Sequence, residues 1–157
     1  MMIHPNSSAM GLVDVAIIEA VWAHRGQRCK VGRPAILHPL RVMEAVKNLG
    51  EEAMAAAVLH DVVEDTDVTL ADLRATGFSP QVVEVVDLCS RPPDGSPDRP
   101  TYRAFIERIR ASGNPIAIAV KIADVRDNME RLGEQPEDQR GIITRYRVAL
   151  IALEGGL

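Results

Sequence analysis

The sequence predicts a single all-helical domain, and three observations support this fold class. Apolar residues recur at helical spacing in nearly every segment. Clean alternation of apolar and polar residues, which marks a half-buried strand, is scarce. A chain of 157 residues with 46% hydrophobic residues is long enough for one compact core and too short for two domains. We therefore expect residues 1–157 to form one helical bundle.

Two helices and a polar loop are predicted in the first third of the chain. The first helix runs from about Ser8 to Gly26 and is apolar nearly all round, which is typical of a buried helix. A polar loop follows over residues 27–37. His38 and Pro39 open a second helix that Gly50 ends, because the N–H that proline lacks would be unpaired in a first turn. The apolar stripe of this helix consists of Leu40, Met43, Val46 and Leu49.

Three further helices are predicted over residues 51–90. The third is rich in alanine and spans residues 51–65. Thr69 and Asp72 have the spacing of a capping box and open a short fourth helix, which Gly77 stops. A fifth helix begins at Ser79 and Pro80; its valines also suit a strand, but the sequence offers no partner strands.

The last third of the chain is predicted to form a loop and three more helices. Residues 91–100 hold four prolines and many charges, which predicts a loop that could serve as a lid. Asn114 and Pro115 open a helix that Gly133 closes. The other two helices are indicated by apolar residues at helical spacing, namely Tyr102, Phe105, Ile106 and Ile109, and then Ile142, Tyr146, Ala149 and Leu153.

The stretch VLHDVVEDT, residues 58–66, places a histidine and three carboxylates among apolar residues. On a continuous helix His60 and Glu64 share one face, as do Asp61 and Asp65, through i, i+4 spacing. Carboxylates this close repel one another, and burial without a partner costs several kcal/mol each. A cation is therefore expected among them, unless the stretch is a solvated helix end.

Other segments add polar groups to this set. On the helix after Asn114, Lys121, Asp124 and Asn128 stand at i, i+3 and i+7 among apolar neighbours. These features have plain structural alternatives. His38, at the start of the second predicted helix, could be a helix cap, and the polar face of the helix after Asn114 could be solvated. Together, His38, His60, Asp61 and Asp124 offer two imidazoles and two carboxylates, which is a plausible set of ligands for a divalent metal.

Composition limits the partners. The net charge of −4 argues against long nucleic-acid backbones and favours a small ligand. No apolar run approaches the roughly 20 residues of a membrane span. Cys29 and Cys89 form no CxxC pair, and the N-terminus lacks a signal-peptide pattern, so we expect a cytoplasmic protein. The oligomeric state stays open, a homo-oligomer included.

Four ordered segments resemble the HD-domain phosphohydrolases, and within them the hydrolase domain of RelA/SpoT-type alarmone enzymes and its free-standing small relatives. The segments are AHRGQ at 23–27, ILHPL at 36–40, LHDVVEDT at 59–66 and KIADVRDNMERL at 121–132. The resemblance covers nearly the whole chain. It implies an HD-domain helical bundle that binds one divalent ion, usually manganese, and removes the 3′-pyrophosphate of guanosine tetra- or pentaphosphate.

The resemblance also assigns roles to individual residues. It implies four metal ligands, namely His38, His60, Asp61 and Asp124, and two catalytic acids, Glu64 and Asp65. It matches Lys30 and Asn128 to residues that contact the substrate. The polar loop also supplies Arg28, and the later helix Lys121, as cations for a polyanionic nucleotide.

Elementary chemistry agrees with these roles. A divalent ion lowers the pKa of its water, and Glu64, one turn from His60, is placed to orient or deprotonate that water. The sequence departs from the family in the nucleotide-reading loop, where Cys29, Val31 and Ala35 stand at the places of an arginine, a serine and an aromatic residue. The base therefore stays open between guanine and adenine, as in (p)ppGpp or (p)ppApp. Two other functions stay in view, a nucleotidase of the HD family and a non-catalytic nucleotide-binding regulator.

Overall fold

The computed structural model describes residues 10–134 and 139–155, which form helices and, between Arg28 and Pro34, an isolated β-bridge. The prediction of an all-helical fold is confirmed. The α-helices are α1 Leu12–Ala23, α2 Leu37–Ala45, α3 Glu51–Leu59, α4 Val62–Asp65, α5 Leu70–Thr76, α6 Pro80–Cys89, α7 Tyr102–Ser112, α8 Pro115–Glu130 and α9 Arg140–Glu154. Two 3₁₀ turns, η2 Lys47–Leu49 and η3 Leu132–Glu134, follow α2 and α8. None of the described helices has both the length and the apolarity that crossing a membrane requires.

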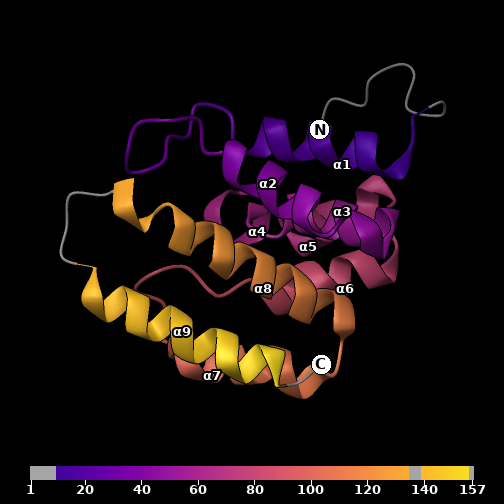
Figure 1. Cartoon of the computed structure of the whole chain (residues 1–157). Helices are drawn as coiled ribbons and strands as arrows, with labels where there is room; N and C mark the ends of the chain where they lie inside the picture. The colour runs from indigo at the N-terminus through magenta and orange to yellow at the C-terminus, as the bar shows by residue number, and fades with distance from the viewer. Residues whose placement is uncertain (1–9, 135–138, 156–157) are drawn as a thin grey trace.

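Two central helices, α3 and α8, position the residues of interest. Helix α3 packs against α1, α2 and α6, and residues 55–59 are fully buried. Three of those five are alanines, whose small side chains let the neighbouring helices approach closely. Helix α8 crosses the molecule between the layer of α1, α2 and α3 and the layer of α7 and α9 (Figure 1). Polar groups at the end of α3 therefore meet polar groups on α8.

The predicted helix boundaries hold where a local cap defines them. Thr69 Oγ1 accepts a hydrogen bond from the Asp72 N–H at 3.1 Å, and Asp72 Oδ2 accepts from the Thr69 N–H at 2.9 Å, so the capping box is confirmed. Gly77 ends that helix with a φ of +101°, a conformation that glycine adopts without strain. Ser79 and Asn114 cap α6 and α8. These ends depend on residues three or four apart, which the sequence displays directly.

The first helix differs from the prediction. Its predicted start at Ser8 lies outside the described residues, and α1 begins at Leu12. The prediction that this helix is buried was wrong: Ala16 and Ala20 are buried against the core, whereas Val21 and Trp22 are 47% and 42% exposed. Helix α1 lies on the outside of α3 (Figure 1), so only one of its faces is covered although its residues are apolar all round.

The predicted stripe of the second helix was also partly wrong. Val46 is buried and Leu40 and Met43 are partly buried, but Leu49 is 53% exposed, and Val42 occupies the core instead. The reason is that α2 ends at Ala45 and continues as the 3₁₀ turn η2. A 3₁₀ turn advances by three residues rather than 3.6, which rotates Leu49 away from the face that the α-helical spacing predicts.

The continuous helix predicted over residues 51–65 is broken. Helix α3 ends at Leu59, His60 and Asp61 form a turn, and α4 starts at Val62. The His60 N–H reaches the Ala57 carbonyl, three residues back, at 3.4 Å. The assumption of one face shared by His60 and Glu64 along a regular helix was therefore wrong. Asp61 and Asp65 keep helical spacing, because the Asp65 N–H donates to the Asp61 carbonyl at 2.9 Å.

Candidate metal centre and substrate cavity

The turn after α3 fixes the orientation of His60. Its Nδ1 lies 2.7 Å from the Ala57 carbonyl oxygen. A carbonyl oxygen only accepts hydrogen bonds, so Nδ1 carries the hydrogen, and the lone pair of a neutral ring is at Nε2. That Nε2 lies 3.0 Å from Asp61 Oδ1 and 3.8 Å from Asp124 Oδ1. His60 is fully buried, and its Nε2 faces two carboxylates.

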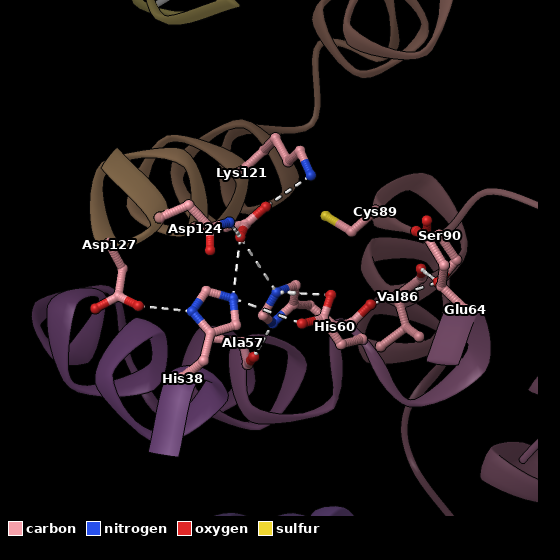
Figure 2. Close-up of polar contacts among 12 residues, drawn as sticks. His38, Ala57, His60, Glu64, Val86, Cys89, Ser90, Lys121, Asp124 and Asp127 are labelled. Atoms are coloured by element: carbon pink, nitrogen blue, oxygen red, sulfur yellow. Dashed lines mark hydrogen bonds and ion pairs between the residues drawn. The ribbon is translucent and has the colours of Figure 1, made fainter. Parts of the chain in front are cut away.

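Asp127 orients His38 in the same way. His38 Nδ1 lies 2.6 Å from Asp127 Oδ2, while the Arg41 Nε–H donates to Asp127 Oδ1 at 2.6 Å. Asp127, which is held by Arg41, accepts the hydrogen of His38 Nδ1, so the lone pair of a neutral ring is at Nε2. The Nε2 side of the ring faces Asp124 (Figure 2), and Nε2 lies 3.0 Å from Asp124 Oδ1. Asp61 Oδ2 lies 3.5 Å from the same nitrogen. Partners of this kind around ligating histidines hold the tautomer that a metal needs.

Helix α8 supplies Asp124 together with two donors that hold it. Lys121 Nζ donates to Asp124 Oδ2 at 2.6 Å, and Asn128 Nδ2 donates to Oδ1 at 2.7 Å. The ammonium of Lys121 also lies 4.9 Å from the centre of the Phe105 ring. Burial alone would raise the pKa of Asp124, but Lys121, with the two imidazoles, lowers it well below its ordinary range. The carboxylate is therefore kept charged inside the core.

The two imidazoles lie in an environment that favours positive charge. Burial alone would lower the pKa of His38, but hydrogen bonds to Asp124 and Asp127 raise it. Burial would likewise lower the pKa of His60, but Asp61 and Asp124 raise it well above its ordinary value. The carboxylates thus create a negative potential around the two Nε2 atoms, and the cation expected at this stretch stays a prediction.

These residues fit a divalent metal ion. One ligand atom each from His38, His60 and Asp124 lies within 4.8 Å of the other two. His60 Nε2 is buried and makes no hydrogen bond of good geometry with the described residues, although Asp61 Oδ1 lies 3.0 Å away. Two carboxylates, Asp61 and Asp124, match the charge of a divalent ion, and imidazole with carboxylate is a common donor set for such ions. The group that meets this distance criterion contains three of the four predicted ligands; Asp61 lies 3.0 Å from His60 Nε2 and 3.5 Å from His38 Nε2 but is not part of it, so its role as a ligand stays a prediction.

A cavity of about 610 Å³ opens onto this cluster. Three of the predicted ligands line it, and His60 lies buried beneath its wall. The other predicted site residues that line it are Arg28, Glu64, Asp65, Lys121 and Asn128. Lys30 is exposed on the loop between α1 and α2 and does not line this cavity, so its contact with substrate stays a prediction. A second cavity, of about 570 Å³, shares Gln27 and Asp65 with the first, and none of the predicted ligands lines it.

The two predicted acids differ in their surroundings. Glu64 is held by the 90–101 segment: its Oε2 accepts the Arg91 backbone N–H at 3.1 Å, and its Oε1 accepts the Arg99 Nη2–H at 3.2 Å. The Asp65 residue is exposed overall, but desolvation of its carboxyl group, followed by the charges of Asp61 and Glu64, raises its pKa to about 6. One acid is thus paired with arginines and the other lies among negative charges.

Several functional residues were missed in the sequence. Asp127 follows Asp124 by three residues on one helix, and this spacing was the available signal. Gln27 donates to the Asp65 carbonyl at 2.8 Å and contacts His24 Nδ1 at 2.8 Å, which links the AHRGQ segment to the acids. Arg91 and Arg99 had no signal, because their partner lies 27 and 35 residues earlier in the chain.

The chain is similar to enzymes of alarmone metabolism. It is 34% identical over 142 residues to the guanosine-3′,5′-bis(diphosphate) 3′-pyrophosphohydrolase of Vibrio cholerae, with 83% of this chain and 19% of the relative covered. It is 33% identical over 142 residues to the bifunctional (p)ppGpp synthase/hydrolase SpoT of Escherichia coli, with the same two coverages. The chain spans about a fifth of the length of these relatives.

The fold is shared with a solved structure described as a metazoan ortholog of SpoT that hydrolyzes ppGpp. The TM-score is 0.75 at 24% identity, over 99% of this chain and 88% of the other. The HD domain family model matches residues 16–147, a range that contains all four predicted ligands and both acids. The chain belongs to the HD domain family.

Proposed function

We propose that this chain is a metal-dependent pyrophosphohydrolase that removes the 3′-pyrophosphate from a nucleotide alarmone such as (p)ppGpp or (p)ppApp. One observation carries the proposal: two imidazoles, each held through Nδ1, direct Nε2 at the carboxylates of Asp61 and Asp124, beside a cavity of about 610 Å³ with two further acids on its wall. The activities for which the relatives are named support the choice of substrate, and 83% of this chain is covered by the match to them.

His38, His60, Asp61 and Asp124 would hold one divalent ion per chain, and we propose manganese. When bound, the ion supplies a Lewis acid that lowers the pKa of water and stabilises negative charge on phosphoryl oxygens. Lys121 keeps Asp124 charged, Asn128 donates a hydrogen bond to its Oδ1, and Asp127 fixes the orientation of the His38 ring. One role that these three residues share is thus to fix the ligands before the ion arrives.

Glu64 and Asp65 are the proposed catalytic acids. In the proposed reaction a water molecule attacks the phosphorus next to the 3′ oxygen and that P–O bond breaks, so that the 3′ oxygen takes up a proton and becomes a hydroxyl group while pyrophosphate is released. Glu64 orients the water and takes its proton. Arg28 and Lys121, which line the cavity, and Lys30 on the neighbouring loop are the proposed cations for the phosphates, and Asn128 is a further substrate contact.

A nucleotide panel tests this function. The protein is incubated with manganese and with ppGpp, pppGpp, ppApp, pApp and simple nucleotides, and the products are separated by chromatography. Release of pyrophosphate from one or more alarmones is expected, and the preferred base follows from the same data. Release of orthophosphate from monophosphates would identify a nucleotidase instead, and tight binding without any product would identify a regulator.

Metal removal is expected to lower the melting temperature. A ligand that binds only the folded state stabilises it by about 2.7 kcal/mol at 100 times its dissociation constant. Each kcal/mol shifts the melting temperature of a domain of this size by roughly 2–4 °C. Thermal unfolding with and without a chelator measures the effect. The His60→Ala protein is the control, because it lacks a ligand and should show no shift; an unchanged melting temperature of the wild-type protein would contradict a tight site.

A further inference from the structure

Arg91 is the first residue after the α6 cap in the segment that joins α6 to α7, and it reaches the cavity of the candidate site. It lines the same cavity as the predicted ligands and the two acids. Its side chain is 20% exposed, so the guanidinium is largely removed from water. A cation held in this way needs an anionic partner nearby, because desolvation of an unpaired charge is costly.

The anionic partner that Arg91 has in this structure is Glu64, and the pairing is incomplete. The backbone N–H of Arg91 donates to Glu64 Oε2 at 3.1 Å, whereas its guanidinium Nη2 stays 3.5 Å from Oε1. The Nε–H of Arg91 is buried and has no hydrogen-bond partner among the described residues. Glu64 is therefore anchored by the main chain, and the planar head of Arg91 retains donor capacity.

Two aromatic rings hold this head in place. The guanidinium carbon lies 5.5 Å from the centre of the Tyr102 ring and 5.2 Å from that of Phe105. Tyr102 also lines the cavity. Contacts of this kind restrict the side chain before an anion binds, so the arginine loses less conformational entropy on binding. The fork of N–H donors is pre-organised, and it matches the geometry of phosphate oxygens.

Arg99 has a different position, although it also contacts Glu64. It donates to the Pro92 carbonyl and pairs with Asp94 Oδ1 at 3.0 Å, both within its own segment. It does not line the cavity. Its guanidinium is occupied by the folding of the segment, so Arg99 holds the segment against Glu64 and is not placed to receive a ligand.

We infer that Arg91 binds the 3′-pyrophosphate of the substrate and so distinguishes pyrophosphorylated nucleotides from nucleotides without that group; this inference rests on the proposed function. The reacting phosphorus has to lie near Glu64 if Glu64 acts on the attacking water, and Arg91 is the arginine that both contacts Glu64 and lines the cavity. The phosphates on the 5′ side are left to the loop that carries Arg28.

The test compares two ligands that differ only in the 3′ group. Binding of ppGpp and of GDP is measured by calorimetry with the metal-loaded Glu64→Gln protein, in which hydrolysis is slow, with and without Arg91→Ala. We expect Arg91→Ala to weaken ppGpp binding by roughly 10- to 100-fold, the scale of a lost charged hydrogen bond. GDP binding should change by less than about threefold, because GDP lacks the group that Arg91 contacts.

Two controls make the result specific. Arg108→Ala removes an exposed arginine that pairs with Asp87 outside the cavity, and it should leave both affinities unchanged. Arg91→Lys keeps a charge but not the planar fork, so its ppGpp affinity should fall between that of the parent protein and that of the Arg91→Ala variant; it also replaces the alanine variant if that variant does not fold. Two results would overturn the inference. One is a ppGpp affinity that is the same in the parent protein and in the Arg91 variants; the other is a loss of affinity that is equally large for ppGpp and for GDP. The measurement reads binding and not turnover, so it remains decisive if the panel shows no hydrolysis.

Discussion

Asp124→Ala is expected to abolish metal binding and to destabilise the fold by about 3–5 kcal/mol, the usual cost of removing one partner from a buried ion pair. Asp124 accepts hydrogen bonds from Lys121 and Asn128 and faces both imidazoles, so its loss leaves a buried ammonium without its carboxylate. Elemental analysis and denaturant unfolding measure the two effects. His60→Ala should also lose the metal, and unchanged metal content in both variants would refute the ligand assignment.

The double variant Asp124→Ala/Lys121→Met separates the two roles of Asp124. Methionine is apolar and close to the length of lysine, and removing both members of a buried ion pair is often nearly neutral. The double variant should therefore regain most of the lost stability while its metal content stays low. Recovery of the metal together with stability would show that Asp124→Ala lost the ion through unfolding and that Asp124 is not a ligand.

Glu64→Gln is expected to keep the metal and to lose on the order of 100-fold or more in turnover, the scale of a positioned acid or base. Glutamine preserves the shape of the side chain, and its carbonyl oxygen is still able to accept the hydrogen bond from the Arg91 N–H. Substrate binding should be retained and is expected to tighten, because one negative charge near the phosphates is gone. Single-turnover rates and metal content are the measurements.

Two neighbouring carboxylates serve as comparisons for Glu64→Gln. Asp65→Asn should also slow turnover, because Asp65 lines the cavity with Glu64. Asp67→Asn should have little effect, since Asp67 lies beyond the end of α4 and does not line that cavity. A Glu64→Gln protein that hydrolyses every responsive nucleotide at the wild-type rate would leave a metal site without the proposed base and would favour the regulator.

Helix ends with a local cap and the types of candidate ligand were predictable from the sequence because they depend on local information. The cap at Thr69 and the proline at the start of α8 act within one helical turn, and both are found where predicted. The grouping of Lys121, Asp124 and Asn128 on one face follows from helical spacing alone, and the structure places all three at the cavity. Imidazoles and carboxylates in this order indicated a metal site before any distance was known.

Tertiary structure decided the features that depend on distant segments. Local spacing gave no sign that the chain turns at His60 and Asp61, because the turn is coupled to burial of the ring under the cavity. The contact between Asp127 and His38 joins residues 89 positions apart, and those of Arg91 and Arg99 with Glu64 join residues 27 and 35 apart. Sequence by itself determined which chemical groups this protein has and which segments of the chain carry them. Only the packing of α3, α8 and the 90–101 segment decided which nitrogen faces which carboxylate, because hydrogen bonds act over about 3 Å and helix packing alone brings such residues within that range.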